Sequence, residues 1–374
     1  MLLALIYFYS FALLSYLAKN SIKTPKKRVR FEVIACFIML FSFFGFRDLP
    51  ALNDTSHYYE HFEYVLRYGD ISFSKIFKYD IYDRFTIGYQ IYERLIGAIF
   101  NHPYMIICIS ALITTISFLY FARKHTERVS FLMFMCLTTF MLNVYSGIRQ
   151  GLATCIFLFA LIFLERGRTI VFYALVLLAI TLHSSSVVLL FLPVFQRIPL
   201  NKITILMVVF VTLMAIIGIN QLVGLTGLDE MNYFDVNNER ESLPIGSILN
   251  SFVLLMIIFI TYRIKEKLSI RNTDTSSLFW WISILSLFFS VLDTQFPILG
   301  RFCLYFNIVV FALFLYYVDQ IRNYKTRKII LVSVVCFLML RIWVVLEFKP
   351  EWYHLEPYTF YDFSIKLHDT QFGY

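Results

Sequence analysis

Charge is scarce in this chain, since only 16% of its 374 residues are Asp, Glu, Lys or Arg, against roughly 25% in a typical soluble domain. Hydrophobic residues make up 59% of the sequence, and the mean hydropathy is +0.70. Water does not accommodate so much apolar surface, and a bilayer admits helices because they pair their own backbone groups. The composition excludes a soluble protein and predicts an all-α polytopic membrane protein, with residues 1–374 as a single integral membrane domain.

Several motifs are missing as well. The six cysteines lie in apolar runs without C-x-x-C spacing, so we interpret them as core residues rather than redox or metal ligands. There is no internal repeat and no glycine-rich phosphate loop. Residues 1–18 lack a basic leader and a cleavage site, and we expect them to form a retained span. The net charge of +8 lies mostly in short loops, which favours membrane lipids over nucleic acid as the partner.

Long apolar runs are abundant. With short or re-entrant segments included, we expect about 11–13 membrane helices, each span needing about 17–25 residues. Basic residues collect in cytoplasmic loops, so the basic loop 19–30 is placed inside. Three segments are then extracytoplasmic: a loop at 47–85 with short amphipathic helices, a loop at 224–244 and a tail at 347–374. The clear spans begin near Leu2, Phe31, Tyr104, Val129, Ile148, Ile203, Ile245, Leu278, Phe302 and Ile329.

Two segments leave the topology open. Residues 86–100 form a short run that contains Glu93 and Arg94, and residues 169–195 form a long run that is interrupted by HSSS at 183–186. If the first only dips into the interface and the chain turns at HSSS, the basic loops share one side. If both cross the membrane instead, five basic residues move to the opposite side, so we prefer the first topology. The five are Arg123, Lys124, Arg128, Arg166 and Arg168.

Residues 57–61 read HYYEH, which matches the H-x-x-E-H pattern of one class of zinc peptidase. A catalytic zinc site needs a third ligand, and no second acid-rich helix supplies one, so we interpret the match as accidental and expect no metal site. In the same stretch Asp54, Tyr58 and Phe62 recur at i, i+4 and i+8, which places them on one helical face. A capped amphipathic helix that only shields the bundle is the alternative interpretation.

Two arginines open apolar segments at the predicted outer side. Arg149, followed by Gln150, begins one segment, and Arg301 begins another after a short loop that contains Asp293. A guanidinium binds phosphate oxygens through two parallel hydrogen bonds, so the two arginines could hold one diphosphate. Alternatively, Arg149 is an ordinary ion-paired or snorkelling residue, and Asp293 and Arg301 pair with each other.

His183 precedes three serines inside an apolar run. Non-helical backbone at membrane depth lines a cavity in known membrane proteins, and histidine is the most frequent general base near neutral pH. A polar core residue with no part in chemistry remains the alternative.

Several short motifs, taken in their order along the chain, resemble those of the EpsG/Wzy-like family of membrane polysaccharide polymerases. The sequence departs from the family pattern at Thr86, where an acid is common, and at Asn53, where a glycine is common; the first departure argues against a catalytic carboxylate in that loop. The matching positions are Arg47 with Asp54, Tyr58 and Phe62, FTIGY at 85–89, Arg149 and Gln150 with Ala153, His183 to Ser185, Arg301 with Tyr305, and EPYTF at 356–360.

The resemblance implies a GT-C-like fold and a metal-independent glycosyltransferase of the bacterial cytoplasmic membrane that needs no cofactor. Such an enzyme makes O-antigen, capsule or exopolysaccharide at the extracytoplasmic face. It would move a growing glycan from undecaprenyl diphosphate onto the non-reducing end of a repeat unit that is itself an undecaprenyl-diphosphate-linked oligosaccharide, and a chain-length regulator is a further expected partner.

The resemblance also implies roles for individual residues. Arg149 and Arg301, assisted by Arg47, would neutralise the diphosphate, while His183 or Asp54, the first being preferred, would deprotonate the acceptor hydroxyl. Two other functions stay open, a flippase or transporter of the same lipid-linked oligosaccharide and an outer-face acyl- or phosphotransferase. Transporters usually pair two broken helices, and one is evident here. The predicted substrate contacts are Gln150, Tyr58, Tyr59, Ser184, Ser185, Asp293 and Tyr305.

Overall fold

The computed structural model describes residues 1–67, 86–226, 245–268 and 274–363. Within these ranges the chain forms fifteen α-helices, a few short 3-10 segments and no strand, which confirms the all-α prediction. Most of the predicted loop 224–244 lies outside the described residues, as do positions 68–85 of the first predicted loop and 364–374 of the tail.

Seven helices are long and apolar enough to cross a membrane, so the chain is a multi-pass membrane protein. They are α1 (Leu2–Ser21), α5 (Met105–His125), α8 (Ile148–Glu165), α12 (Ile245–Leu268), α13 (Asp274–Asp293), α14 (Gly300–Asp319) and α15 (Tyr324–Phe348). The other helices are α2 (Pro25–Gly45), α3 (Thr55–Arg67), α4 (Ile87–Ile99), α6 (Val129–Leu137), α7 (Met141–Ser146), α9 (Thr169–Leu182), α10 (Leu192–Arg197) and α11 (Lys202–Thr226).

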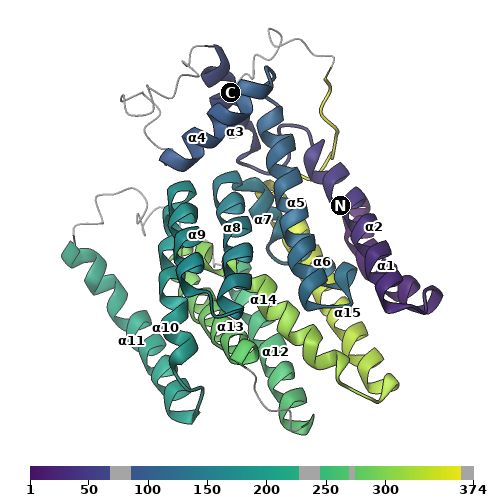
Figure 1. Ribbon diagram of the computed structural model, residues 1–374, viewed down its shortest axis with the longest axis vertical. Helices are drawn as coiled ribbons and strands as arrows, with labels where there is room; N and C mark the ends of the chain where they lie inside the picture. Colours follow the sequence, from purple (N-terminus) through teal and green to yellow (C-terminus); the bar gives the residue numbers. More distant parts are fainter. Residues whose placement is uncertain (68–85, 227–244, 269–273, 364–374) are drawn as a thin grey trace.

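Burial differs between the helices as their composition requires. Every residue of α6 is buried, and most of α14 is buried too, because a helix that is apolar on all sides fits only inside the bundle. Helices α1, α11 and α15 leave large apolar side chains exposed along their length, as lipid-facing helices do. Figure 1 shows α1 and α11 at opposite edges of the bundle.

The turns between α1 and α2, α5 and α6, and α14 and α15 line one pocket, and the turn between α14 and α15 lies at the lower right in Figure 1. There Arg28 pairs with Glu127 at 2.6 Å, and Arg128 pairs with Asp319 at 2.6 Å. We call this part, residues 19–28, 123–128 and 319–327, the basic end.

Helices α3 and α4 lie across the opposite end of the bundle (Figure 1). Helix α4 has 13 residues, and at 1.5 Å per residue it is about 20 Å long, shorter than the hydrocarbon core of about 30 Å. This length favours the topology in which residues 86–100 do not span the membrane.

The run 169–195 is broken at the predicted place. Helix α9 ends at Leu182, His183 is extended, and the 3-10 helix η2 (Ser184–Phe191) follows. The hydroxyl of Ser186 lies 3.4 Å from the Ala179 carbonyl, so η2 turns back against the last turn of α9. The structure therefore confirms a break at HSSS.

The tail packs on the loop that follows α2. Arg47 and Phe360 form an isolated antiparallel bridge, and the N–H of Asp48 donates to the Thr359 carbonyl at 3.0 Å. The Tyr361 ring stacks on Tyr104 at 4.0 Å between centroids. The EPYTF segment thus fixes the loop that leads to Asp54 and α3.

Candidate functional site

A cavity of about 320 Å³ opens between α3, the start of α8, the break after α9, and helices α12, α13 and α14. Helix α8 contributes its N-terminal residues, while its last residue, Glu165, binds Lys124 at the basic end, so the cavity lies toward the opposite end of the bundle. The predicted residues that line it are Asp54, Tyr58, Arg149, Gln150, His183, Asp293 and Arg301.

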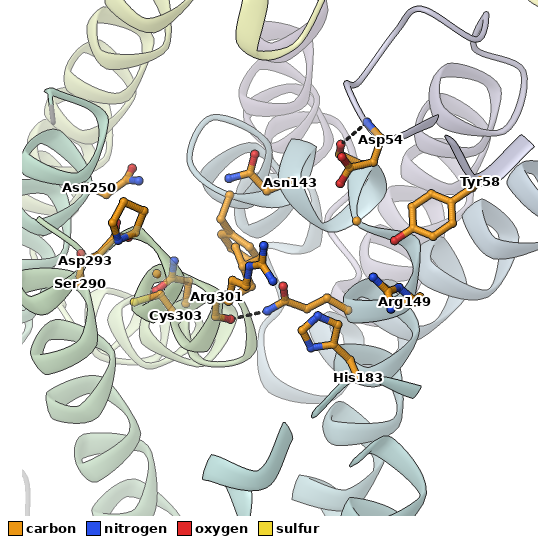
Figure 2. Close-up of a pocket in the computed structure, with 18 residues that line it drawn as sticks. Asp54, Tyr58, Asn143, Arg149, His183, Asn250, Ser290, Asp293, Arg301 and Cys303 are labelled. Atoms are coloured by element: carbon orange, nitrogen blue, oxygen red, sulfur yellow. Dashed lines mark hydrogen bonds between the residues drawn. The ribbon is translucent and has the colours of Figure 1, made fainter. Parts of the chain in front are cut away.

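Arg149 and Arg301 occupy equivalent positions, each the second residue of a helix. Gly147 and Gly300, at the two helix starts, also line the cavity. The first N–H groups of a helix have no partner inside it and favour a negative charge. Two guanidiniums and the N-terminus of α8 therefore bring positive charge to one cavity, and Figure 2 shows Arg149 and Arg301 among the residues that line it.

Asp293 does not pair with Arg301. Its carboxylate accepts the backbone N–H of Gly300 and a hydrogen bond from Ser247. A Cβ at Gly300 would lie 2.3 Å from Asp293 Oδ1, so only glycine permits this approach. Asp293 thus caps α14, and Arg301 has no ion-pair partner among the described residues.

His183 connects the cavity to a row of hydroxyl groups. Its Nδ1 lies 2.6 Å from Ser185 Oγ, and the Tyr305 hydroxyl lies 2.9 Å from both Ser185 Oγ and Ser186 Oγ. We assign the protons so that Nδ1–H donates to Ser185, Ser185 to Tyr305, Tyr305 to Ser186, and Ser186 to the Ala179 carbonyl. The N–H of Ser185, 3.4 Å from Nδ1, would favour the other tautomer, but that contact is much longer. This assignment leaves the Nε2 lone pair free for the cavity.

The ionisation of His183 follows from its surroundings at the helix break. Burial lowers its pKa to about 4, and the positive charges of Arg149 and Arg301 act in the same direction. The imidazole is therefore neutral at physiological pH and able to accept a proton.

The FTIGY motif holds the end of α9. Thr86 Oγ1 donates to the Leu182 carbonyl at 2.7 Å, one residue before His183. Gly88 packs directly on Thr181, since a Cβ at Gly88 would lie 2.7 Å from the Thr181 carbonyl oxygen. Phe85 lies outside the described residues. The motif therefore positions His183 without reaching the cavity itself.

Helix α3 brings Asp54 and Tyr58 to the cavity. The N–H of Asp54 donates to Ser146 Oγ at 3.3 Å, which ties the start of α3 to α7 (Figure 2). Burial raises the pKa of the Tyr58 phenol, although the Arg149 guanidinium donates a hydrogen bond to it. Phe62, on the same face, is fully buried in the core.

Other predicted residues do not line the cavity. Arg47 is 1% exposed, and its guanidinium donates to Thr55 Oγ1 at 3.1 Å and to the Tyr145 carbonyl at 3.0 Å. Tyr59 is buried, with its hydroxyl 3.3 Å from that of Tyr361. Ser184 is exposed outside the cavity, and Ser185 and Tyr305 lie behind His183. The structure thus gives Arg47 and Tyr59 supporting positions, because their polar groups are occupied within the protein.

The two histidines of HYYEH point to different surroundings. His57 is exposed, whereas His61 is buried with Nδ1 2.8 Å from Glu93 Oε1 of α4. Burial raises the pKa of Glu93, and the His61 contact opposes that shift. The pair joins α3 to α4.

Several polar residues of the cavity wall were not predicted, among them Asn143, Asn250, Ser290 and Asn307. Behind the wall, Arg341 of α15 is buried and donates to Asn250 and to the Thr138 carbonyl. A lone arginine in the middle of an apolar span is a functional signal, and Arg341 could have been found that way.

A comparison with family models gives one match, to the EpsG family over residues 30–360. No curated protein and no solved structure matches the chain, so the GT-C-like fold remains a prediction. The matched range covers most of the chain and contains every residue of the cavity. The chain therefore belongs to the EpsG family, which indicates a membrane role of the glycan-polymerase type in polysaccharide biosynthesis.

Proposed function

We propose that the chain is a polymerase that transfers a growing glycan from undecaprenyl diphosphate onto the non-reducing end of a lipid-linked repeat unit, at the extracytoplasmic face of the membrane. The observation that carries the proposal is the convergence of Arg149, Arg301 and a neutral His183 in one cavity.

The two arginines suit a diphosphate leaving group. Arg149 stands at the N-terminus of α8, where phosphate is favoured by both the backbone N–H groups and the helix dipole. Arg301 adds a second guanidinium at the start of α14, whose first N–H is donated to Asp293. Preorganised positive charge acts most strongly where negative charge develops in the transition state. The arginines would thus do the work that a divalent cation does in metal-dependent transferases.

His183 is then the base. In the transfer step, the acceptor hydroxyl oxygen attacks the anomeric carbon of the donor glycan. The bond from that carbon to the diphosphate oxygen breaks, and its electron pair stays on the diphosphate. The hydroxyl proton passes to Nε2 of His183, and the resulting imidazolium is stabilised by the hydroxyl row through Ser185 and Tyr305.

Because of the charges around His183, its pKa should depend on whether the diphosphate donor is bound. Two cations, after burial, help to hold the pKa of His183 near 4. A bound diphosphate would offset those cations and raise the pKa toward neutrality, where a general base is most effective. Asp54, which is exposed at the cavity mouth, is the alternative base.

The remaining wall suits sugars. Tyr58 contributes its phenol beside Arg149, and Gln150, Asn143, Asn250 and Asn307 line the wall with amide groups that suit sugar hydroxyls. The lipid chains of both substrates would lie in the membrane beside the bundle, and a chain-length regulator would act on the product from outside the site.

The test is polymer synthesis by Arg149→Lys and His183→Ala. Lysine keeps the charge of Arg149 but loses its planar fork, and loss of a general base costs about 10²–10⁴ in rate. We expect both variants to stay in the membrane, to make no long polymer and to accumulate single lipid-linked repeat units.

Two matched controls use residues away from the cavity. Arg166→Lys changes an exposed arginine at the other end of α8, and His57→Ala removes an exposed histidine of α3; both should make full-length polymer. Wild-type polymer from R149K and H183A would refute the proposed site, and substrate trapped in the cytoplasmic leaflet would indicate a transporter.

A further inference from the structure

A second cavity, of about 610 Å³, lies at the basic end. Its wall contains six Lys and Arg residues and three carboxylates, and these come from three separate turns of the bundle. Basic residues in cytoplasmic loops ordinarily extend into water. Here they converge on one pocket, so the composition of the loops alone does not account for the arrangement.

The carboxylates in this wall are already engaged. Glu127 pairs with Arg28 and Asp319 with Arg128, both at 2.6 Å. Glu32 is buried and accepts the hydroxyl and the N–H of Ser130, at 2.7 and 2.9 Å. Two of the three carboxylates therefore already form an ion pair with an arginine, and the third is held by Ser130.

Three cations are left over. Lys124 binds Glu165 at 2.7 Å, but Lys19, Arg123 and Arg327 have no carboxylate partner among the described residues that surround them. Lys19 and Arg327 are half-buried on α1 and α15, the two lipid-facing helices that flank the cavity. The cavity therefore carries an excess of positive charge that an anion would relieve.

Tyrosines beside the cavity indicate its level in the membrane. Tyr316 lines it and is 42% exposed, and Tyr16 and Tyr324 are exposed beside it. The ammonium group of Lys328 lies 5.9 Å from the Tyr16 ring centroid. Tyrosines collect at the headgroup level of a membrane, so the cavity opens where lipid phosphates lie.

We propose that this cavity binds the phosphate headgroup of an anionic phospholipid, with Lys19 and Arg327 as the main contacts. Guanidinium and ammonium groups both bind phosphate, and basic pockets between membrane helices hold such headgroups. A bound headgroup would join α1, the α5–α6 turn and α15, and so stabilise the fold. This inference does not depend on the proposed glycosyl transfer.

The experiment is a lipid titration of the purified full-length protein in neutral detergent, followed by its thermal unfolding. Short-chain phosphatidylglycerol should raise the unfolding temperature, and phosphatidylcholine should not. Each cation near an anionic headgroup strengthens binding roughly fivefold. The double variant Lys19→Gln, Arg327→Gln should therefore weaken phosphatidylglycerol binding by about 25-fold.

The matched control is the double variant Arg322→Gln, Lys325→Gln, which removes the same charge from exposed positions outside the cavity wall and should bind as the wild type does. Equal loss in both double variants, or loss in neither, would overturn the proposal. A separate titration uses inorganic pyrophosphate: stabilisation by pyrophosphate and not by phosphatidylglycerol would overturn the lipid assignment. If K19Q/R327Q does not fold, R327Q alone should show the fivefold effect, and its absence would overturn the proposal.

Discussion

The contact between Gly88 and Thr181 allows a sharp test of how the FTIGY motif acts. An alanine at position 88 would place its Cβ 2.3 Å from Thr181 Oγ1 and 2.7 Å from the Thr181 carbonyl oxygen, whereas ordinary contact begins near 3.4 Å. The hydroxyl can rotate away, but the carbonyl is backbone. Helix α4 and the end of α9 must therefore separate by about 1 Å, at an overpacking cost of about 1–3 kcal/mol.

That displacement acts where His183 is held. It would break or stretch the 2.7 Å bond from Thr86 to the Leu182 carbonyl, and a misplacement of about 1 Å in a catalytic group can cost about 10²-fold in rate. We expect Gly88→Ala to lower the rate of polymer extension by about that factor while the protein remains in the membrane. The assay is extension of lipid-linked repeat units by purified protein, with products sized on a gel.

The same helix supplies the control. A Cβ at Gly97 would meet the Leu66 side chain at 3.3 Å, which can rotate, and the Phe62 ring at ordinary contact distances of 3.6 and 3.8 Å, so Gly97→Ala should keep nearly full activity. In a His183→Ala background, Gly88→Ala should cause little further loss, because its effect passes through His183. Wild-type rates in G88A, or a full additional loss in the double variant, would refute the argument.

Two more predictions follow from the site. Because neutral His183 is the active form and its pKa is about 4, kcat/KM should fall as pH drops toward 4. The corresponding fall in kcat should occur at higher pH, since the bound diphosphate raises that pKa; identical limbs for both parameters would contradict this mechanism. Arg47→Lys should lower the free energy of unfolding by about 1.5–3 kcal/mol, because the Tyr145 carbonyl and Thr55 lose a charged donor. It should leave the KM for the lipid diphosphate unchanged, and a raised KM with unaltered stability would restore Arg47 to the diphosphate site.

The sequence was sufficient for the class of fold and for much of the site. Scarce charge and long apolar runs require a helical membrane protein, whatever the helices pack against. The positions of Arg149 and Arg301 at segment starts, and of His183 before three serines, are visible as local breaks in apolar pattern. Such breaks are costly in lipid, so they identify the cavity residues before any contact is known.

Only the tertiary structure separated the residues that face the cavity from those that support it. Arg47 and Arg149 look alike in sequence, since each is an arginine beside an apolar segment. Arg47 is buried against the Tyr145 carbonyl, whereas Arg149 lines the cavity. Likewise, Asp293 caps α14 instead of pairing with Arg301, because Gly300 lets the carboxylate approach its backbone N–H closely.

The sequence by itself determined which residues must be kept out of contact with lipid, because that depends on the polarity of each side chain along one helix. It did not determine which partner each of them meets, because partners such as Thr86 and Leu182, or Arg128 and Asp319, are far apart in the chain. Those pairings arise from the packing of whole helices. They therefore decide where the two cavities lie and which charges remain uncompensated in each.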